Sequence, residues 1–219
     1  RPNDGRIDRQ GRLVFGGYNE KHRSDGGRSI SGVYRLERDE TVVRLLDRRV
    51  RVANSIAFSP SGDVMYFCDS PTGDILAFPF VDDSDASDAL AYPDRSPTEL
   101  AVLRRPPSVF YNTPEDSPGF PDGATVDSEG ALWSAQFGAS QVVRHRAEDG
   151  AIDTVVHVPV PNVTCCALGG ANLRTLYITT TRRKMTEEEL LEKPEAGSLF
   201  QVEVPVPGLP EPEFNLSLM

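Results

Sequence analysis

Short apolar runs separated by polar turns dominate this chain. Runs such as 33–36, 64–68 and 132–135 are rich in β-branched and aromatic side chains and are bounded by Gly, Asp, Asn or Ser. This pattern is typical of strands joined by tight turns. The predicted strands fall into four groups: 5–8, 13–15, 33–36 and 42–46; 56–58, 64–68 and 75–78; 124–126, 132–135, 141–144 and 154–156; and 165–168, 176–179 and 199–202. The sequence therefore predicts an all-β fold.

One clear helical signal interrupts the last group. Thr186 is followed three residues later by Glu189, which is the pattern of a capping box, and Pro194 ends the segment. We expect a short helix between two strands, with its glutamates in solvent.

A polar residue precedes a glycine by eight positions at four places in the chain. The pairs are Asn3 and Gly11, Asn54 and Gly62, Asp122 and Gly130, and Asn162 and Gly170. A side chain that recurs at the same phase of a repeat occupies the same place in each structural unit. Once a long interruption in the second unit is discounted, the spacing approaches the roughly 40–50 residues of a four-stranded propeller blade. We therefore predict a β-propeller in which the four polar residues converge on the central axis.

The interruption covers residues 82–119. This range is rich in Asp, Ser and Pro and contains apolar pieces at 100–103 and 109–111. Loops of such length without structure of their own are uncommon inside compact domains. We therefore predict that most of it is an acidic insertion within a single domain spanning residues 1–219.

Composition narrows the possible partners. The formal net charge is −10, about half of it within the predicted insertion, which argues against binding to nucleic acid or to an anionic membrane surface. No apolar run approaches the roughly 20 residues that cross a bilayer. Cys68, Cys165 and Cys166 lie in apolar strand-like runs and form no disulfide framework, so a cytoplasmic location is expected. The chain begins at Arg1 inside a repeat, so we expect that the natural N-terminus, with any targeting signal, is missing.

The repeated polar residues form the candidate site. Amide oxygens and one carboxylate suit hard cations such as calcium, magnesium or manganese, and no His or Cys spacing suggests a closed zinc site. Asn and Asp also begin turns by bonding to their own backbone, so a turn role stays open at each position. Asp122 together with Asn54 favours a functional site.

Several segments resemble a known family. These are RPNDGRIDRQGRLVFGG, ANSIAFSPSGDVMYFCDS, PDGATVDSEGALWSAQFG, and the run from Cys165 and Cys166 through Tyr177 to AGSLFQV. In this order, and over nearly the whole chain apart from the insertion, they resemble the gluconolactonase, regucalcin and senescence-marker-protein family. The resemblance implies a six-bladed β-propeller, of which this chain would be an N-terminally truncated portion of about four blades.

The resemblance also implies one catalytic divalent cation, calcium or else zinc, manganese or magnesium, and hydrolysis of a small-molecule sugar lactone. Asn54 and Asp122 match two of the family's metal ligands. The third, a glutamate near the N-terminus, has no counterpart because the chain begins after it, so inactivity of the chain as written is a further expectation. Arg1 and Asn3 match residues that hydrogen-bond the sugar, and Glu20 is placed at a further acidic substrate contact. The full-length protein is expected to be a monomer.

The implied mechanism is metal-assisted ester hydrolysis. The cation polarises the lactone carbonyl and acidifies a water, while Asp122 takes a proton and later returns it to the leaving oxygen. Ser55 stands where many family members have glycine, which is expected to alter the turn beside Asn54. The alternatives are a non-catalytic propeller scaffold, a calcium-binding regulatory protein, or another hydrolase on the same fold.

Overall fold

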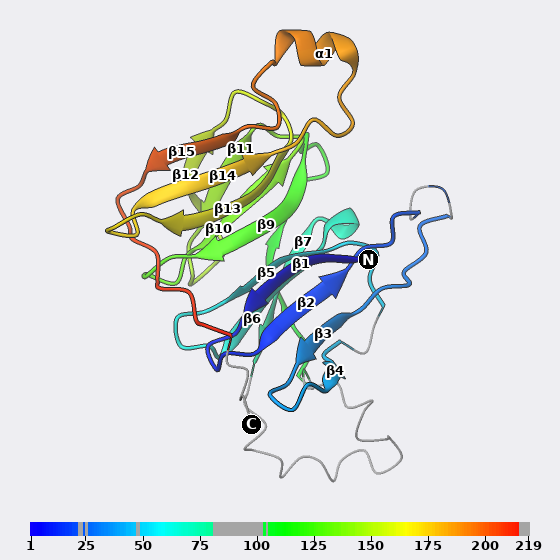
Figure 1. The fold of residues 1–219 in the computed structure, drawn as a ribbon, viewed down its shortest axis with the longest axis vertical. Helices are drawn as coiled ribbons and strands as arrows, with labels where there is room; N and C mark the ends of the chain where they lie inside the picture. Colours follow the sequence, from blue (N-terminus) through cyan, green and yellow to red (C-terminus); the bar gives the residue numbers. More distant parts are fainter. Residues whose placement is uncertain (22–23, 25, 47–48, 81–102, 104, 215–219) are drawn as a thin grey trace.

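The computed structural model describes residues 1–219 with the exception of 22–23, 25, 47–48, 81–102, 104 and 215–219. Most of the described chain forms four antiparallel sheets, each of which is one blade (Figure 1). The first blade contains β1 (Pro2–Ile7), β2 (Leu13–Gly17), β3 (Val33–Leu36) and β4 (Val42–Arg44). The second contains β5 (Ala53–Phe58), β6 (Val64–Asp69), β7 (Asp74–Pro79) and β8 (Ser108–Asn112). The third contains β9 (Phe120–Val126), β10 (Leu132–Phe137), β11 (Gln141–His145) and β12 (Ile152–His157), and the fourth contains β13 (Val163–Gly169), β14 (Thr175–Thr180) and β15 (Leu199–Glu203).

This arrangement confirms the all-β propeller and the portion of four blades predicted from the sequence. Strands that are neighbours in the chain pair with each other in every sheet, as short turns between antiparallel strands require. The inner strand β5 is buried along its whole length, whereas β3 alternates between buried and half-buried positions. The outermost strand β12 is mostly exposed. The inner strand β1 of the first blade, by contrast, has no buried residue.

The range expected to be an insertion contains one strand of the propeller. Ser108–Asn112 forms β8, which pairs with β7 and completes the second blade. The apolar piece predicted at 109–111 therefore belongs to the sheet, because Phe110 packs on Tyr66 with ring centroids 4.8 Å apart. The greater part of the expected insertion, 82–102 together with 104, lies outside the described residues.

The four glycines of the repeat share one backbone conformation. Gly11, Gly62, Gly130 and Gly170 have φ angles of 81°, 80°, 83° and 81°, in the left-handed region that glycine enters without steric cost. In the first three blades the glycine amide donates to the carbonyl of the residue three positions earlier, at 3.0 Å. The fixed offset in the sequence thus has a physical cause, since each glycine follows the inner strand of its blade.

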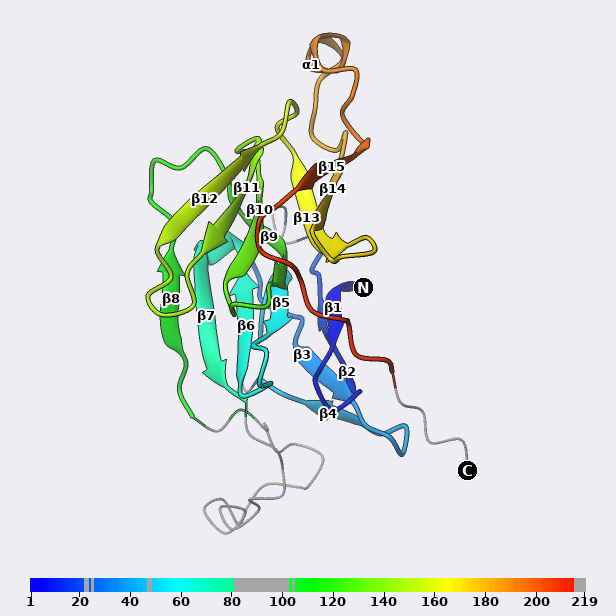
Figure 2. The same cartoon turned by 90° about the vertical axis from the view of Figure 1, so that its left-hand side faces the viewer.

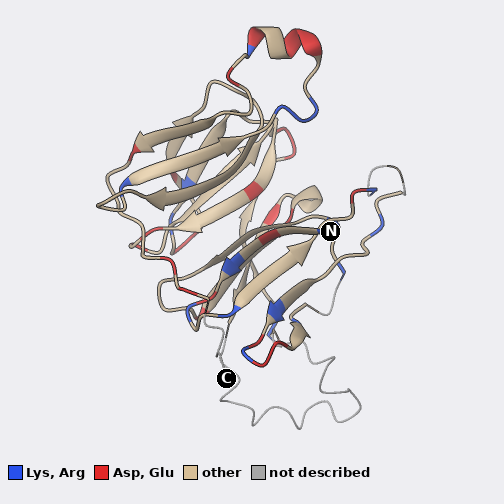
Figure 3. Cartoon of the chain, in the orientation of Figure 1, with Lys and Arg blue, Asp and Glu red and all other residues tan. Residues whose placement is uncertain are grey.

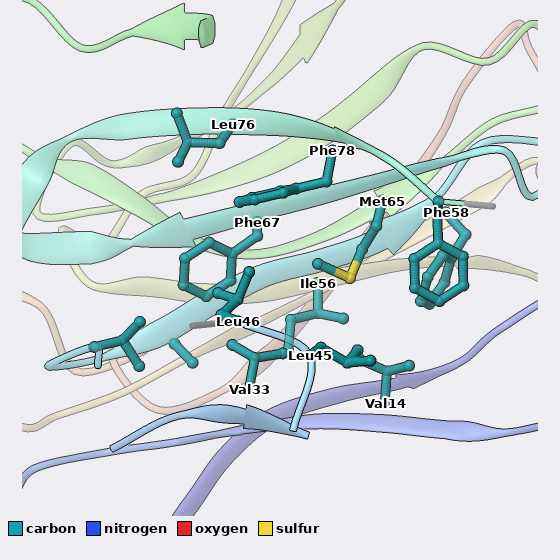
Figure 4. Close-up of a cluster of buried hydrophobic side chains, with 13 residues drawn as sticks. Val14, Val33, Leu45, Leu46, Ile56, Phe58, Met65, Phe67, Leu76 and Phe78 are labelled. Carbon is teal, nitrogen blue, oxygen red and sulfur yellow. The ribbon is translucent and has the colours of Figure 1, made fainter. Parts of the chain in front are cut away.

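Three hydrophobic cores join the blades. The inner strands pack in the order β1, β5, β9 and β13, and Figure 2 shows β1, β5 and β9 side by side. The core between the first two blades includes Val14, Leu45, Ile56, Met65 and Phe67 (Figure 4). A smaller core joins the second and third blades around Tyr66 and Leu132. A third core, around Trp133 and Leu176, joins the third and fourth blades.

The predicted helix is present as α1 (Glu187–Glu192), which projects from one end of the fourth blade (Figure 1). The Thr186 hydroxyl accepts from the Glu189 amide, and the Glu189 carboxylate accepts from the Thr186 amide, so the capping box is complete. None of the helical residues is buried. No helix within the described ranges is long and apolar enough to cross a membrane.

Candidate functional site

Each inner strand carries one extra residue at the same phase of its blade. Pairing with the second strand shifts between Pro2 and Gly5 in β1, Asn54 and Ala57 in β5, Pro121 and Ala124 in β9, and Val163 and Cys165 in β13. A β-bulge of this kind bends a strand and re-aims its side chains, and bulges are over-represented beside active sites. The repeated polar residues therefore lie at bulges in the first three blades, where backbone geometry departs from the regular ladder.

The bulge in β5 explains the expected effect of Ser55. Its φ angle is 55°, a left-handed conformation that costs a non-glycine residue energy. The Ser55 hydroxyl donates to the carbonyl oxygen of Asp122 at 2.7 Å. Serine thus occupies a position suited to glycine, and its side chain ties the second blade to the third.

A chain of hydrogen bonds links the first three blades through Asn54. The side-chain nitrogen Nδ2 of Asn3 donates to Asn54 Oδ1 at 2.7 Å, and Asn54 Nδ2 donates to Ser70 Oγ at 2.7 Å. The Ser70 hydroxyl then donates to the carbonyl of Pro121 at 2.8 Å. This network assigns the orientation of the Asn54 amide, with its oxygen toward Asn3. Asn54 is buried and held from both ends.

The side chains of this network line a cavity of about 510 Å³. The predicted residues Asn3, Asn54 and Asp122 all contribute to its wall, together with Ser70 from the 3₁₀ helix η1 (Ser70–Thr72). The structure therefore brings three of the four repeated polar residues together at one end of the inner strands. Figure 3 shows acidic positions on both β1 and β9.

Asn162 does not join them. Its side chain donates to the carbonyl of Arg183 at 2.9 Å, and it is absent from the cavity lining. The expectation of four converging residues is therefore wrong at this position. Asn162 instead fixes the loop after β14, because its side chain donates to a carbonyl 21 residues further along the chain.

Arg1 and Glu20 lie at the edge of the site. Arg1 Nε pairs with Glu20 Oε1 at 2.7 Å, and this hydrogen bond holds the pKa of the exposed Glu20 below its ordinary value. Neither residue lines the cavity, but the Arg1 guanidinium lies 4.9 Å from the ring centroid of Tyr18, which does. The pair is thus connected to the cavity through Tyr18.

The sequence reasoning missed Asp4. Its carboxylate accepts from the amides of Gly5 at 2.8 Å and Ile56 at 2.9 Å, which places it between the first and second blades. Burial raises its pKa to about 6, opposed by these amides and by Arg6. Burial likewise raises the pKa of Asp122 to about 7, with the charge of Asp4 adding to the effect and Lys184 opposing it. Its place in the sequence could have indicated it, because Asp4 directly follows Asn3 within the same bulge.

Cys165 is a second neighbour of the carboxylates. A Cβ on Gly123 would lie 2.4 Å from the Cys165 sulfur, so β9 and β13 approach each other here as closely as glycine allows. Burial raises the pKa of Cys165 to about 11, and the charge of Asp4 adds to the shift. Cys165 is therefore a thiol at neutral pH, and its side chain packs against Gly123 of β9.

Two basic residues complete the cavity wall. Arg183 and Lys184 come from the loop between β14 and α1 and lie at the rim of the cavity. The repeat gave no indication of them, because this loop has no counterpart in the other blades.

The fold and the site together place this protein in the class of β-propellers whose cavity is lined by carboxylate and amide side chains. The chain belongs to the SMP-30/Gluconolactonase/LRE-like region family, whose sequence profile matches residues 1–182. It is 37% identical to L-arabinolactonase of Azospirillum brasilense over 98% of this chain and 63% of the relative. It is 33% identical to 6-deoxy-6-sulfogluconolactonase of Pseudomonas putida over 97% of this chain and 65% of the relative.

A solved structure supports the same architecture. The calcium-binding protein regucalcin from Agrobacterium tumefaciens superimposes with a TM-score of 0.82 at 26% identity, covering 98% of this chain and 65% of that one. The chain thus spans 63% to 65% of the length of these three relatives.

Proposed function

We propose that this chain forms the site of a sugar lactonase that uses one divalent cation. The observation that carries the proposal is the placement of Asn54 and Asp122 on one cavity wall, in a family whose members include named lactonases. The substrate is a sugar lactone, as the names of those relatives suggest.

Asn54 and Asp122 would hold the cation. The donor set fits a hard cation, since both residues offer oxygen and Asn54 Oδ1 is oriented by its hydrogen bonds. Within the described ranges no group of three or more His, Cys, Asp or Glu residues could hold a metal ion. Calcium is the first candidate because the regucalcin neighbour is named as calcium-binding, with zinc, manganese or magnesium as the others.

When bound, the cation would polarise the lactone carbonyl and lower the pKa of a water. Asp122 accepts the proton of the attacking water as the new C–O bond forms. It returns that proton to the ring oxygen as the lactone C–O bond breaks, which yields the open hydroxy acid. In the cation-free site, burial together with the charge of Asp4 raises the pKa of Asp122 to about 7.

Asn3, Arg1 and Glu20 position the sugar in this proposal. Asn3 lines the cavity beside Asn54, whereas the Arg1 and Glu20 pair stands at the edge through Tyr18. Arg1 and Glu20 therefore suit hydroxyl groups remote from the reacting carbonyl. A cytoplasmic location and a monomeric state remain parts of the same proposal, supported for the location by three free cysteines.

The decisive experiment is lactone hydrolysis by Asp122→Asn in the complete protein. Loss of a positioned proton-transfer group lowers the rate about 10²–10⁴-fold. The control is Asp149→Asn, which changes an exposed aspartate in a turn of the third blade. Activity of the Asp122 variant within a few-fold of the parent, or a panel of aldonolactones that the parent does not hydrolyse, would contradict the proposal.

A calcium-binding regulatory protein is the second candidate, favoured by the name of the regucalcin neighbour. Calcium titration by calorimetry separates the two when combined with the assay above. A protein that binds calcium through Asn54 and Asp122 but opens no lactone has the regulatory function. If neither Asn54→Ala nor Asp122→Asn changes the calcium affinity, these residues hold no calcium, and the non-catalytic propeller scaffold is the remaining alternative.

A further inference from the structure

Hydrogen bonds to the backbone of the loop that carries Arg183 and Lys184 hold this loop in place. Asn162 binds it twice, since its side chain donates to the Arg183 carbonyl at 2.9 Å and its carbonyl accepts from the Thr181 amide at 3.0 Å. The Arg183 amide donates to Thr181 Oγ1 at 3.1 Å. Lys184 has a left-handed φ of 67°. These contacts fix the direction in which the two basic side chains leave the loop.

Both side chains extend toward aromatic residues of other blades. Arg183 Nη2 donates to the Tyr18 hydroxyl at 3.1 Å, and its guanidinium lies 5.6 Å from the Tyr18 ring centroid. This contact joins the fourth blade to the first. The Lys184 amine lies 4.6 Å and 5.6 Å from the ring centroids of Phe137 and Phe120, which stack on each other at 5.3 Å.

Side chains of both charges line the cavity, with Arg183 and Lys184 facing the same space as Asp122 and Glu115. Arg1, at its edge, is paired with Glu20, whereas Arg183 forms no ion pair with any residue that the structure describes. Tyr18, Phe120 and Phe137 offer aromatic faces that hold a cation without neutralising it. The basic positions of this loop appear in blue before α1 in Figure 3. Arg183 therefore presents a positive charge to the cavity without an ion pair among the described residues, and Lys184 presents one that acts on Asp122.

We propose that the substrate is a lactone that carries an anionic group, and that Arg183 and Lys184 hold this group at the rim of the cavity. This inference rests on the proposed lactonase function and adds the substrate class. A planar guanidinium pairs with two oxygens of a carboxylate, sulfonate or phosphate at once, and the ammonium of lysine adds a second, compact charge. The lactone carbonyl would lie at the cation site formed by Asn54 and Asp122, and the anionic group of the substrate would lie against the loop. A cavity of about 510 Å³ accommodates a monosaccharide lactone extended in this way.

The test compares neutral and anionic lactones with the complete protein. The probes are glucono-1,5-lactone, its 6-phosphate, and the carboxylate-bearing glucaro-1,4-lactone. The parent is expected to favour at least one anionic probe in kcat/KM, and the preferred probe tells phosphate from carboxylate. Because Arg183 contacts Tyr18, away from Asp122, Arg183→Gln should act mainly by raising KM for that probe. Lys184→Gln also removes a charge that acts on Asp122, so its effect is read from the ratio between the probes. Each is expected to lower the ratio of anionic to neutral kcat/KM roughly tenfold.

Two further variants serve as controls. Arg182→Gln removes a neighbouring exposed charge that does not line the cavity, so it should leave the ratio unchanged. Arg183→Lys keeps the charge and should retain more of the ratio than Arg183→Gln. Circular dichroism melting shows whether each variant is folded.

The outcomes distinguish this inference from the proposal beneath it. If the parent hydrolyses neutral lactones at least as well as both anionic ones, or if the Arg183 and Lys184 variants leave the ratio unchanged, the inference is wrong and the lactonase function stands. If the parent hydrolyses none of the three probes and no other aldonolactone, the lactonase function fails and the inference fails with it.

Discussion

The Oδ2 atom of Asp4 accepts a hydrogen bond of 2.9 Å from the backbone amide of Ile56. Ile56 lies in the bulge of β5, where the regular pairing with β6 is interrupted between Asn54 and Ala57. A bulge leaves its extra residue without a ladder partner, and a buried amide without an acceptor is costly. A carboxylate of the first blade thus completes the backbone of the second, two residues from Asn54.

Asp4→Ala should therefore weaken the bulge that orients Asn54. Loss of the acceptor for Ile56 is expected to lower the free energy of unfolding by about 1–3 kcal/mol. Asp4→Asn retains a carbonyl acceptor and should cost less. Urea denaturation measures the change, and amide hydrogen exchange at Ile56 reports on its cause. Asp116→Ala, at an exposed position, is the control. Unchanged exchange at Ile56 in Asp4→Ala would show that the contact contributes nothing.

Gly123→Ala should disturb the contact between β9 and β13. The new Cβ would lie 2.4 Å from the sulfur and 2.7 Å from the Cβ of Cys165, so one strand must shift. Overpacking of this kind typically costs about 1–3 kcal/mol. Because Cys165→Gly removes both atoms, the double variant should be more stable than the sum of the two single changes in unfolding free energy predicts. Additive effects would mean that the backbone accommodates the methyl group elsewhere.

The strands and turns were predictable because their signals are local. Apolar runs, the left-handed glycine of each turn and the capping box at Thr186 depend on residues close in the sequence, and each is present in the structure. The strand β8 was harder to assign, because its residues follow a long acidic stretch and gain their partner only through packing against β7. Length and composition alone gave no sign of that pairing.

The site was predictable where it follows the repeat and not where it departs from it. Asn3, Asn54 and Asp122 share one phase of the blade and line one cavity. Asn162 has the same phase, but its amide binds the Arg183 carbonyl, because the fourth blade has a long loop at that end. Arg183 and Lys184 reach the cavity from that loop, and no periodic pattern could place a residue that occurs in a single blade.

Asp127 is a buried carboxylate outside the site, and the stability of the third blade is expected to depend on it. It is fully buried, and its Oδ2 accepts from Trp133 Nε1 at 2.9 Å and from Arg144 Nε at 2.7 Å, while Oδ1 accepts two backbone amides. Removing one partner of a buried ion pair costs about 3–5 kcal/mol, and Asp127→Ala should reduce the free energy of unfolding by this amount. Glu129→Ala removes a second partner of Arg144 whose side chain is 64% exposed, so it should cost no more than about 1 kcal/mol. Equal costs for the two variants would contradict this interpretation.

His145 should make stability depend on pH below neutrality. Its ring is fully buried, with Nδ1 2.9 Å from the Gly150 carbonyl and the ring centroid 4.4 Å from that of Tyr111. Burial lowers the pKa of His145, opposed by the Gly150 carbonyl and by Asp153. The unfolded chain, with a histidine pKa of about 6.5, therefore binds a proton more readily than the native protein. Stability that is present above about pH 6.5 is lost as the pH falls from there toward the lower pKa of the native state.

Comparison with His145→Phe isolates this effect from the carboxylates of the site. The raised pKa values of Asp4 and Asp122, about 6 and about 7, act in the opposite direction, because the native state then binds protons more readily than the unfolded chain and gains stability as the pH falls. Both proteins share that contribution, so it cancels in the difference. Urea denaturation between pH 8 and pH 5 should show the parent losing stability relative to His145→Phe as the pH falls. His157→Gln, at an exposed position of β12, should follow the parent. A difference that stays constant across this range would show that His145 takes up no proton on unfolding.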